Sequence, residues 1–470
     1  MRRTKIVCTI GPASENPKVL KRLAEAGMNV ARLNFSHGNH EEYARNIFNI
    51  KKISADLNTP IGIIGDLSGP KIRIGEISNK HIVLEAGQSL TLTTRPLIGD
   101  KNKIYVNFPE LPRDVSLGGT ILLNDGLIEL RIKKIEGDEV VTEVVSGGEL
   151  SSHKGVNLPG VSVNIDPITE KDIEDLKFCL ERGIDWVAMS FVRFPGDIKN
   201  LRLLIEDYGE NVPIIAKIEK HEAASKIDEI IDEADGIMVA RGDLGVEMSL
   251  EDVPLIQKRL IDKAMRKGKP VITATQMLNS MIENPRPTRA EVSDVANAIF
   301  DGTDAVMLSG ETAIGDYPVE TVKMMARIIE KTESFIDYSG KLGDKRKWSQ
   351  ESSTDAISFA SCELASGLKA RVIITSTQSG NTARKVSKYR PSEQIAAVTP
   401  EDKTARQLTV SWGVRPLCIT SGRDTDEMIE KSIDKVVEAE MAKKGDVVVI
   451  TAGVIVNIPG TTNLIKVHEV

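Results

Sequence analysis

Residues 214–245 read IIAKIEKHEAASKIDEIIDEADGIMVARGDLG, and they contain the unit from which much of the chain is built. Two short, mostly apolar runs, Ile214–Ile218 and Gly236–Ala240, flank an amphipathic helical pattern over Lys220–Glu233. Short apolar runs separated by such a pattern are typical of buried parallel strands joined through a helix. The stretch therefore predicts one β-α-β unit of a parallel sheet.

The same alternation begins near the N-terminus. Strand-like runs occupy Lys5–Ile10, Val30–Asn34, Ile61–Asp66, Trp186–Phe191, Ile214–Ile218, Gly236–Ala240, Val271–Ala274 and Ala305–Leu308. Helical patterns follow most of them, over Pro17–Ala26, Glu41–Leu57, Lys171–Arg182, Lys220–Glu233, Val253–Arg266 and Pro318–Glu330. Eight such units in series predict an α/β fold, a (β/α)8 TIM barrel. The pattern alone leaves an open, doubly wound sheet as the alternative.

Two stretches interrupt this alternation. Residues 70–165 lack helical periodicity and alternate as strands between Gly-rich turns, which predicts an inserted, barrel-like all-β domain. The polar stretch 339–354 is predicted to be a linker. We therefore expect a catalytic barrel over 1–69 and 166–338. Strands and helices alternate again over 355–470, which predicts a C-terminal open α/β domain.

Composition limits the classes of partner. The net charge of −7 argues against nucleic acid, because proteins that bind it carry a basic surplus. The four cysteines are scattered without ligand spacing, so we expect reduced thiols in a cytoplasmic protein. The opening Met-Arg-Arg-Thr-Lys leads into only a short apolar run, and no run is long enough to span a bilayer. We expect neither a signal peptide nor a membrane partner.

Active sites of such barrels lie where the strands end, and several predicted strands end in polar side chains. Arg32, Asn34 and Ser36 alternate with apolar residues, so they share one face of their strand. Guanidinium groups bind phosphate oxygens, and amide or hydroxyl oxygens bind hard cations. Lys217 and Glu219 also share a face; taken alone, such a pair is most simply a surface ion pair.

The strand after Lys217 and Glu219 supplies Asp243, and this changes the interpretation. Carboxylates on adjacent strand ends can bind Mg²⁺ and leave positions for substrate oxygens. Gly242 lets the backbone approach a ligand, and a helical turn beginning there would present N–H groups to an anion. Cations, a carboxylate metal site and no nucleophilic Cys or Ser-His pair favour phosphoryl transfer. Thr275, at the end of another strand, is weak evidence by itself.

Seven blocks now identify a resemblance. MNVARLNFSHG, KGVNLPG, IIAKIEKHE, DGIMVARGDLGVE, ITATQMLNSM, NPRPTRAEVSDVANAIFDGTDAVMLSGETAIGDYP and PGTTN resemble the blocks of the pyruvate kinase family, in its order and over nearly the whole chain. The resemblance implies transfer of the phosphoryl group of phosphoenolpyruvate to ADP, which gives pyruvate and ATP. It also implies a β-domain lid that excludes water, and a homotetramer with contacts from the PRPTRAE region and the C-terminal domain.

The resemblance further implies a role for each polar strand end. Arg32 would bind the transferring phosphate, and Lys217 would stabilise its charge in the transition state. Glu219 and Asp243 would hold Mg²⁺, with Mn²⁺ as a substitute, and the backbone at Gly242 would hold the substrate carboxylate. Thr275 would touch the substrate near the route of enolate protonation. The side chains that would face ADP or ATP are Asn34, His37, Arg73 and Lys154.

The family's potassium site is altered in this chain. The resemblance places that site at Asn34, Ser36, Asp66 and the carbonyl of Leu67. Many members read D-T-K-G-P-E there, whereas this chain reads DLSGPK over 66–71. A lysine ammonium carries the charge of a potassium ion, so we expect Lys71 to replace that ion and catalysis to proceed without potassium. The alternative is that Lys71 points to solvent and potassium still binds.

A loop of the C-terminal domain predicts regulation. Ser376, Thr377, Ser379 and Thr382 surround Gly380 just before a helix, where hydroxyl and N–H groups can bind phosphate, although an ordinary capped turn has the same pattern. In the family this loop holds a sugar-phosphate or nucleotide effector. The loop 451–463 has no Arg, Lys or Trp, so we expect a monophosphate such as AMP or a sugar monophosphate.

Two other functions compete with this interpretation. One is another barrel enzyme of phosphoenolpyruvate, such as a mutase or a dikinase-like enzyme, although none of the six histidines has a carrier-like setting. The other is a non-catalytic metabolite sensor. The intact set of Lys217, Glu219 and Asp243 argues against a sensor.

Overall fold

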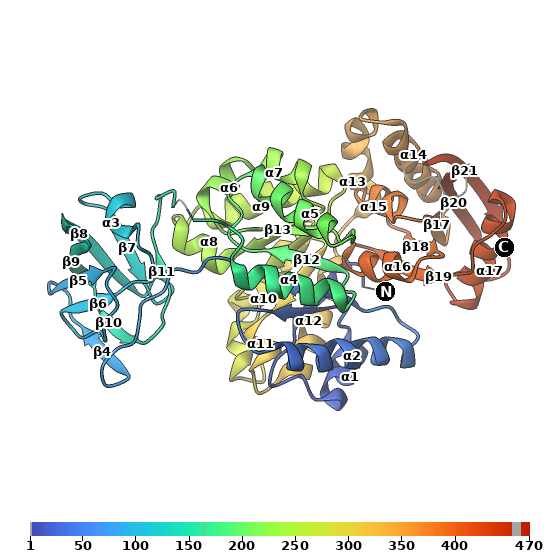
Figure 1. Cartoon of the computed structure of the whole chain (residues 1–470). Coiled ribbons are helices and arrows are strands. Elements are labelled where there is room, and N and C mark those ends of the chain that lie inside the picture. The colour runs from blue at the N-terminus through green and yellow to red at the C-terminus, as the bar shows by residue number, and fades with distance from the viewer. Residues whose placement is uncertain (1, 164, 454–461) are drawn as a thin grey trace.

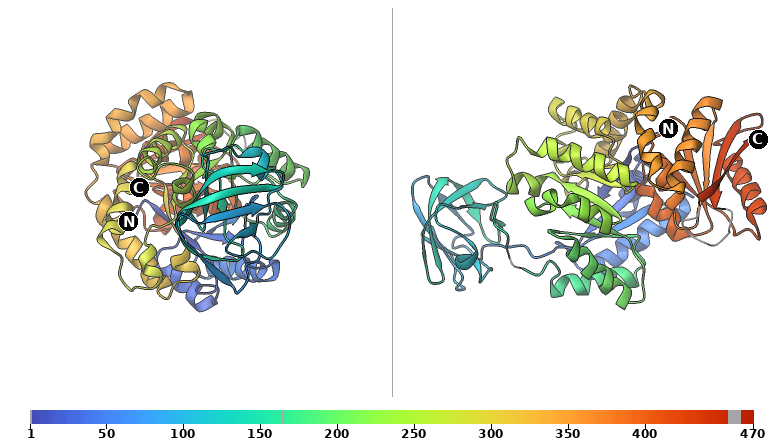
Figure 2. Two further views of the ribbon diagram at one scale, coloured as in Figure 1. Left: turned by 90° about the vertical axis from the view of Figure 1, so that its left-hand side faces the viewer. Right: turned by 90° about the horizontal axis from the view of Figure 1, so that it is seen from above.

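The computed structural model describes residues 2–163, 165–453 and 462–470. Three parts lie in a row: a small β domain at one end, a barrel in the middle and an α/β domain at the other end (Figure 1). Figure 2 shows the same order from above, with the β domain standing clear of the barrel on narrow connections. The inserted domain and the C-terminal domain therefore contact opposite ends of the barrel.

The central part is a closed barrel of parallel strands in the order β1-β16-β15-β14-β13-β12-β3-β2. This confirms the predicted (β/α)8 fold and rules out the open sheet. The strands are β1 (Lys5–Thr9), β2 (Val30–Asn34), β3 (Gly62–Asp66), β12 (Trp186–Met189), β13 (Ile214–Ile218), β14 (Gly236–Ala240), β15 (Val271–Ala274) and β16 (Ala305–Leu308).

Alternate residues of these strands pack on opposite sides of the barrel wall. Val7, Val30 and Ile64 belong to the cluster inside the barrel, whereas Ile6 and Ala31 pack outward with the helices. Side chains with a period of two, apolar on both faces, are what a parallel strand covered on both sides requires. Side chains in the middle of the strands are therefore packed on both faces, and polar side chains lie mainly at the strand ends.

Helices cover the outside of the barrel. They are α1 (Pro17–Ala26), α2 (His40–Asp56), α4 (Glu170–Glu181), α5 (Pro195–Asp207), α6 (His221–Ser225), α7 (Ile227–Glu233), α8 (Arg241–Glu247), α9 (Val253–Lys267), η1 (Asn279–Ile282), α10 (Arg289–Asp301), α11 (Gly310–Ala313) and α12 (Pro318–Glu333). Capping boxes begin several of them; in α10, Thr288 and Glu291 satisfy each other's backbone N–H groups. The pattern over Lys220–Glu233 forms two helices, because Lys226 leaves helical geometry between them.

The inserted domain has its own apolar core, with Leu90, Leu92 and Ile121 among its fully buried members. One sheet has the order β11-β7-β8-β9-β5-β6, and β10 pairs with β4. The elements are β4 (His81–Leu84), β5 (Ser89–Thr93), β6 (Lys103–Tyr105), α3 (Leu111–Asp114), β7 (Thr120–Leu123), β8 (Ile128–Glu136), β9 (Glu139–Ser146), β10 (Gly148–Ser151) and β11 (Val156–Asn157).

The C-terminal domain is an open sheet in the order β19-β18-β17-β20-β21. Its elements are α14 (Ser353–Leu368), β17 (Val372–Ser376), α15 (Asn381–Ser387), β18 (Gln394–Thr399), α16 (Asp402–Gln407), η3 (Leu408–Val410), β19 (Val414–Cys418), α17 (Thr425–Glu438), β20 (Val447–Gly453) and β21 (Thr462–Glu469). The last strand, β21, is antiparallel to β20, whereas the other pairs of the sheet are parallel.

The stretch 339–354, which its polar composition predicts to be a linker, is helical over most of its length. It begins with α13 (Tyr338–Leu342) and η2 (Gly343–Gln350), which are helical. Leu342 and Trp348 are buried in the cluster that contains Phe359 and Tyr389. Two apolar side chains among many polar ones are enough to fix this segment against the C-terminal domain.

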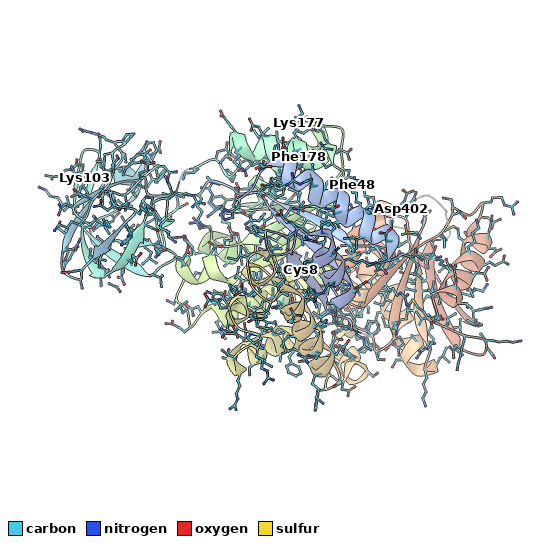
Figure 3. The ribbon with its side chains drawn as sticks, turned by 90° about the horizontal axis from the view of Figure 1, so that it is seen from below. Cys8, Phe48, Lys103, Lys177, Phe178 and Asp402 are labelled. Carbon is cyan, nitrogen blue, oxygen red and sulfur yellow. The ribbon has the colours of Figure 1, made fainter. Side chains whose placement is uncertain are left out.

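The cysteines are isolated thiols, as their spacing predicts. Cys8, Cys179 and Cys362 are buried, and Cys418 is half-buried. Cys8 lies on β1 (Figure 3) in the cluster between the barrel wall and the helices, where burial raises the pKa of its thiol. These thiols are therefore packing groups. Separately, none of the helices in the described ranges has the length and apolar character that crossing a bilayer requires.

The N-terminal ends of the barrel strands are sealed by the C-terminal domain. Val410 of η3 belongs to the cluster inside the barrel. Asp304, just before β16, accepts hydrogen bonds from Arg390 Nη2 and from the backbone N–H of Trp412, each at 2.9 Å. Asp304 and Arg390 are each 4% exposed. A buried ion pair therefore joins the two domains.

We expect Asp304→Ala to destabilise the protein by about 3–5 kcal/mol, because it leaves the buried Arg390 guanidinium without its anion. The midpoint of thermal unfolding measures this loss. The control is Asp232→Ala, since Asp232 pairs with Lys267 where both side chains are about half exposed. That change should cost no more than about 1 kcal/mol. Equal losses in the two variants would contradict the role given to Asp304.

Candidate active site

Charged side chains from three strands meet at the opposite, C-terminal end of the barrel. Arg32 Nε donates to Asp66 Oδ2 at 2.6 Å. Lys217 Nζ lies 3.2 Å from Asp66 Oδ1 and 2.9 Å from Glu219 Oε1. All four residues are buried or nearly so. The strand ends thus place two cations and two carboxylates in one connected row.

Ser190 and Phe191, which the sequence analysis did not select, complete this row from the loop after β12. Lys217 Nζ donates to Ser190 Oγ at 2.7 Å, and Ser190 Oγ donates to the carbonyl of Leu67 at 2.6 Å. The N–H of Phe191 donates to Glu219 Oε2 at 3.1 Å. Phe191 has φ of 57°, so the strand predicted to reach it ends at Met189 instead. The position of Ser190 and Phe191 at the end of a predicted strand was the sequence feature that could have identified them.

The protonation of the row follows from burial and neighbouring charge. Burial alone would raise the pKa of Asp66, but Arg32 and then Lys217 outweigh it and lower that pKa. Burial would lower the pKa of Lys217, and the negative Asp66 and Glu219 raise it instead. For Glu219, burial and the nearby Asp243 raise the pKa against the opposing effect of Lys217. Glu219 and Asp243 are therefore two neighbouring carboxylates whose negative charge is only partly compensated, which favours binding of a cation.

A short helix begins beside these carboxylates, as the sequence suggested. It is α8, which carries Gly242 and Asp243 in its first turn. The N–H of Gly242 donates to Thr275 Oγ1 at 2.7 Å, so α8 meets the end of β15 directly. Arg241, which was not predicted, donates from Nη2 to the carbonyl of Thr275 at 2.8 Å and from Nη1 to Asp294 at 2.7 Å. Arg241 therefore fixes Thr275, whose φ is 67°.

The donors present fit Mg²⁺ with few protein ligands. Within the described ranges, no group of three or more His, Cys, Asp or Glu side chains could hold a metal ion. Glu219 and Asp243 provide carboxylates on neighbouring elements, and the charge of Asp243 adds to the effect of burial in raising the pKa of Glu219. Mg²⁺ characteristically takes one or two carboxylates and completes its shell with water and substrate oxygens. In this structure, however, Lys217 still occupies Glu219 Oε1.

The side chains predicted to face a nucleotide lie where the barrel meets the inserted domain. His37 is exposed on the loop after β2, and its pKa is lowered by partial burial and then by the charges of Arg73 and Lys71. Arg73 Nη1 donates to the carbonyl of His153 at 3.0 Å, next to Lys154. Asn34 Oδ1 accepts from the N–H of Ser36 at 3.4 Å. Ser36 of the barrel and Arg73 of the inserted domain line one pocket.

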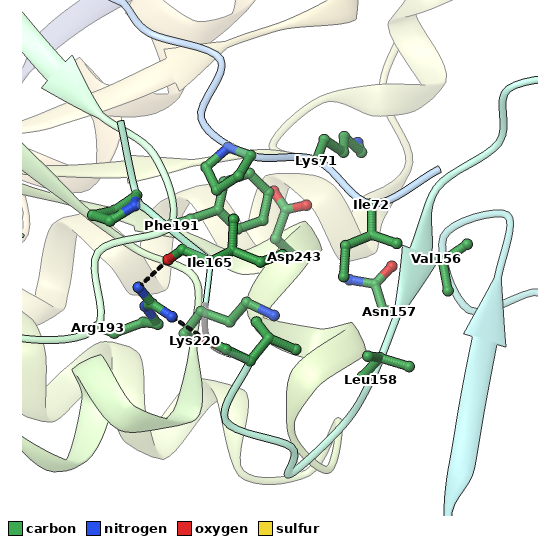
Figure 4. Close-up of a pocket in the computed structure, with 13 residues that line it drawn as sticks. Lys71, Ile72, Val156, Asn157, Leu158, Ile165, Phe191, Arg193, Lys220 and Asp243 are labelled. Atoms are coloured by element: carbon green, nitrogen blue, oxygen red, sulfur yellow. Dashed lines mark hydrogen bonds between the residues drawn. The ribbon is translucent and has the colours of Figure 1, made fainter. Parts of the chain in front are cut away.

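Lys71 is placed differently from our expectation. Its side chain is exposed, and its ammonium makes no hydrogen bond or ion pair with the described residues. The oxygens of Asp66 are taken by Arg32 and Lys217 instead. Lys71 lines a pocket with Asp243 and Lys220 (Figure 4). The solvent-facing alternative describes its position, because Asp66 already has two closer cations.

The predicted effector loop is ordered by its own hydrogen bonds. The N–H of Gly380 donates to Thr377 Oγ1 at 3.0 Å, and Thr382 Oγ1 lies 2.7 Å from Thr462 Oγ1. Ser376 and Ser379 are half-buried. Most of the second predicted contributor, the loop 451–463, lies outside the described residues. These bonds tie Thr377 to Gly380 and Thr382 to Thr462 of β21.

Comparison with known proteins agrees with this architecture. The family model "Pyruvate kinase, barrel domain" matches residues 1–322, and "Pyruvate kinase, alpha/beta domain" matches residues 355–468. The chain belongs to the pyruvate kinase family. A pyruvate kinase from Clostridium acetobutylicum is 48% identical over all of both chains. Those of Geobacillus stearothermophilus and Bacillus licheniformis are each 51% identical over the whole of this chain and 80% and 81% of their own.

Membership of the pyruvate kinase family makes the chain a phosphotransferase of glycolysis. The role of Lys217 in the charged row can be tested in that reaction. We expect Lys217→Met to lower kcat of the pyruvate kinase reaction by roughly a hundredfold or more, because a cation aimed at developing charge acts mainly in the transition state. Binding of Mg²⁺ and phosphoenolpyruvate should be largely retained, as titration calorimetry would show. An unchanged kcat would refute the assignment.

The carboxylates should respond in a different way from the lysine. We expect Glu219→Gln and Asp243→Asn to raise the Mg²⁺ concentration that gives half-maximal activity, because each removes one anionic ligand. Saturating Mg²⁺ should recover part of the activity in these two variants and none of it in Lys217→Met. A common response of all three variants to added Mg²⁺ would contradict the separate roles.

Proposed function

We propose that the protein transfers the phosphoryl group of phosphoenolpyruvate to ADP and forms pyruvate and ATP, as its relatives' name implies. The observation that carries this proposal is the row of Arg32, Asp66, Lys217 and Glu219, with Asp243 beside it. Phosphoryl transfer needs positioning and neutralisation of charge more than covalent chemistry. The row provides two oriented cations and two candidate metal ligands for that task.

Arg32 and Lys217 have different roles in the proposed reaction. Arg32, held by Asp66, presents its remaining guanidinium N–H groups to the phosphate. Lys217, oriented by Asp66, Glu219 and Ser190, stabilises charge on the phosphoryl group as it moves. Because Lys217 already has three oxygen partners, little reorganisation is needed when a phosphate oxygen replaces one of them.

A divalent ion completes the proposed site. Glu219 and Asp243 would hold Mg²⁺, or Mn²⁺ as a substitute, and the ion would neutralise phosphate and enolate charge. Gly242, in the first turn of α8, would receive the substrate carboxylate on its backbone. The Thr275 hydroxyl, which accepts from the N–H of Gly242, would lie beside the substrate on the side where the enolate takes up its proton.

The remaining parts of the proposal concern the surroundings of the site. Asn34, His37, Arg73 and Lys154 would bind ADP and ATP where the barrel meets the inserted domain. The inserted domain would close as a lid and exclude water, which otherwise competes for the phosphoryl group. The homotetramer that the resemblance implies is also part of the proposal. We infer a cytoplasmic location from the reduced cysteines.

The direct test is formation of ATP from phosphoenolpyruvate and ADP, coupled to pyruvate reduction, with Mg²⁺ present. We expect product only when phosphoenolpyruvate, ADP and Mg²⁺ are all supplied. Absence of ATP formation by the purified chain would refute the proposal. A mutase or a metabolite sensor would also fail this assay.

We propose that turnover does not require potassium. In the family pattern that this sequence resembles, an acid occupies the position of Lys71, and the Lys71 charge adds to burial and Arg73 in lowering the pKa of His37. We expect similar kcat in tetramethylammonium buffer with and without added potassium. Lys71→Glu together with Leu67→Thr should need potassium, because it restores the anion and the hydroxyl of the family pattern. A large stimulation of the unaltered protein by potassium would contradict this.

We also propose a monophosphate effector at the loop around Gly380, bound by Ser376, Thr377, Ser379 and Thr382. Its single phosphate would be matched by these hydroxyl groups and by the N–H groups that follow Gly380. We expect AMP or a sugar monophosphate to lower the KM for phosphoenolpyruvate, and Thr382→Val to abolish the shift while kcat stays unchanged. Tight activation by fructose bisphosphate would contradict the monophosphate.

A further inference from the structure

A second ion pair lies beside the charged row, and the function described so far does not use it. Lys220 Nζ donates to Glu247 Oε1 at 2.6 Å. The residues are 8% and 5% exposed. Taking both charges out of water is costly, and such a pair often adds little stability compared with apolar side chains of the same size. Such a pair can instead serve to hold two elements of the fold in one fixed arrangement.

The two ends of this pair join the two elements that carry the proposed metal ligands. Lys220 directly follows Glu219 at the end of β13. Glu247 is the last residue of α8 and lies four positions after Asp243, so the two carboxylates share one face of that helix. Any shift of α8 along or about its axis would therefore move Asp243 and strain the contact with Lys220.

The same helix is where the inserted domain touches the barrel. Asn157, at the end of the last lid strand β11, donates from Nδ2 to Glu247 Oε1 at 3.3 Å. The lid turn at Gly126 lies against Val246, since a Cβ atom there would be 3.7 Å from Val246 Cγ2. Lys220, Asn157 and Asp243 line one pocket (Figure 4). Glu247 thus receives one bond from the lid and one from the metal-binding strand.

Glu247 also keeps an unused acceptor. Its Oε2 is buried, and no donor of the described residues lies within hydrogen-bond distance of it. A buried carboxylate oxygen without a partner is unfavourable, so it favours any arrangement that brings a donor to it. Asn157 has a second amide hydrogen and sits on the segment that moves with the lid. A movement of β11 would therefore change the hydrogen bonding of Glu247.

We propose that Lys220 and Glu247 are positioning residues that couple the lid, through Asn157, to the geometry of Glu219 and Asp243. The inference rests on the proposed phosphotransfer and adds the device that links lid position to the metal site. When the lid is in place, α8 is held so that Asp243 and Glu219 face one ion. When the contact between Asn157 and Glu247 is broken, α8 no longer holds Asp243 at a fixed position relative to Glu219, and the ion is bound less well.

The test uses two lid-coupling variants and one control. Asn157→Leu removes the lid contact with similar volume. Lys220→Met combined with Glu247→Gln removes both buried charges together, so that neither is left unpaired. The control is Lys258→Met combined with Asp301→Asn, which removes an ion pair between α9 and α10, away from the lid. Thermal unfolding of all three variants monitors simple loss of stability.

Two measurements then separate coupling from a merely structural role. The Mg²⁺ concentration for half-maximal activity should rise roughly tenfold in both lid-coupling variants and stay unchanged in the control. Dyes on Lys101→Cys in the lid and Lys21→Cys on α1, in a Cys418→Ser background, should report a smaller change in energy transfer on adding Mg-ADP in the same two variants.

A Mg²⁺ dependence like that of the control, or an unaltered energy-transfer change, would overturn the proposal. Energy transfer is read without turnover, so the result does not depend on the reaction assigned. Failure of the unaltered protein to make ATP would instead refute the proposed function. Asn157→Asp adds a further check, because a carboxylate facing Glu247 should raise the Mg²⁺ requirement more than Asn157→Leu does.

Discussion

Asp66 is 1% exposed and lies between the guanidinium of Arg32 and the ammonium of Lys217. A carboxylate so deeply buried would be very unfavourable without these partners, and they in turn would repel each other without it. With Glu219 added, the row has two positive and two negative formal charges. A substrate that brings negative charge therefore needs further positive charge. The neighbouring Glu219 and Asp243 are where a divalent ion can supply it.

The barrel separates this chemistry from the features that hold the domains together. At the N-terminal strand ends, Asp304 pairs with Arg390 and Asp185 pairs with Arg406, and Val410 closes the interior. Those side chains are committed to packing and ion pairs with the C-terminal domain. The C-terminal strand ends are free of that task, so charged groups there can be arranged for a ligand at some cost in stability.

Local pattern favoured the barrel over an open sheet and identified the polar strand ends that form most of the charged row. A period of two placed Arg32 with Asn34, and Lys217 with Glu219, because strand geometry alone determines which side chains share a face. Ser190, Phe191 and Arg241 were missed, since their roles depend on loops that meet residues distant in sequence. Lys71 was misplaced for the same reason: its neighbour in sequence, Asp66, is satisfied by side chains from other strands. In the predicted linker, average polarity concealed the buried Trp348.

The inserted domain is held to the barrel by few but well-defined contacts, and in the proposed role as a lid its position would matter at the active site. Asp172, at the start of α4, accepts from the N–H of Gly69 on the outgoing stem at 3.0 Å and from Thr169 after the returning one. Arg193 donates to the carbonyl of Ile165 at 2.6 Å. Stems fixed at their bases leave movement to the short segments between these contacts and the β domain. Asn157 lies where the returning segment leaves the inserted domain, so even a small rotation there would alter its contact with Glu247 before it altered the fold of either domain.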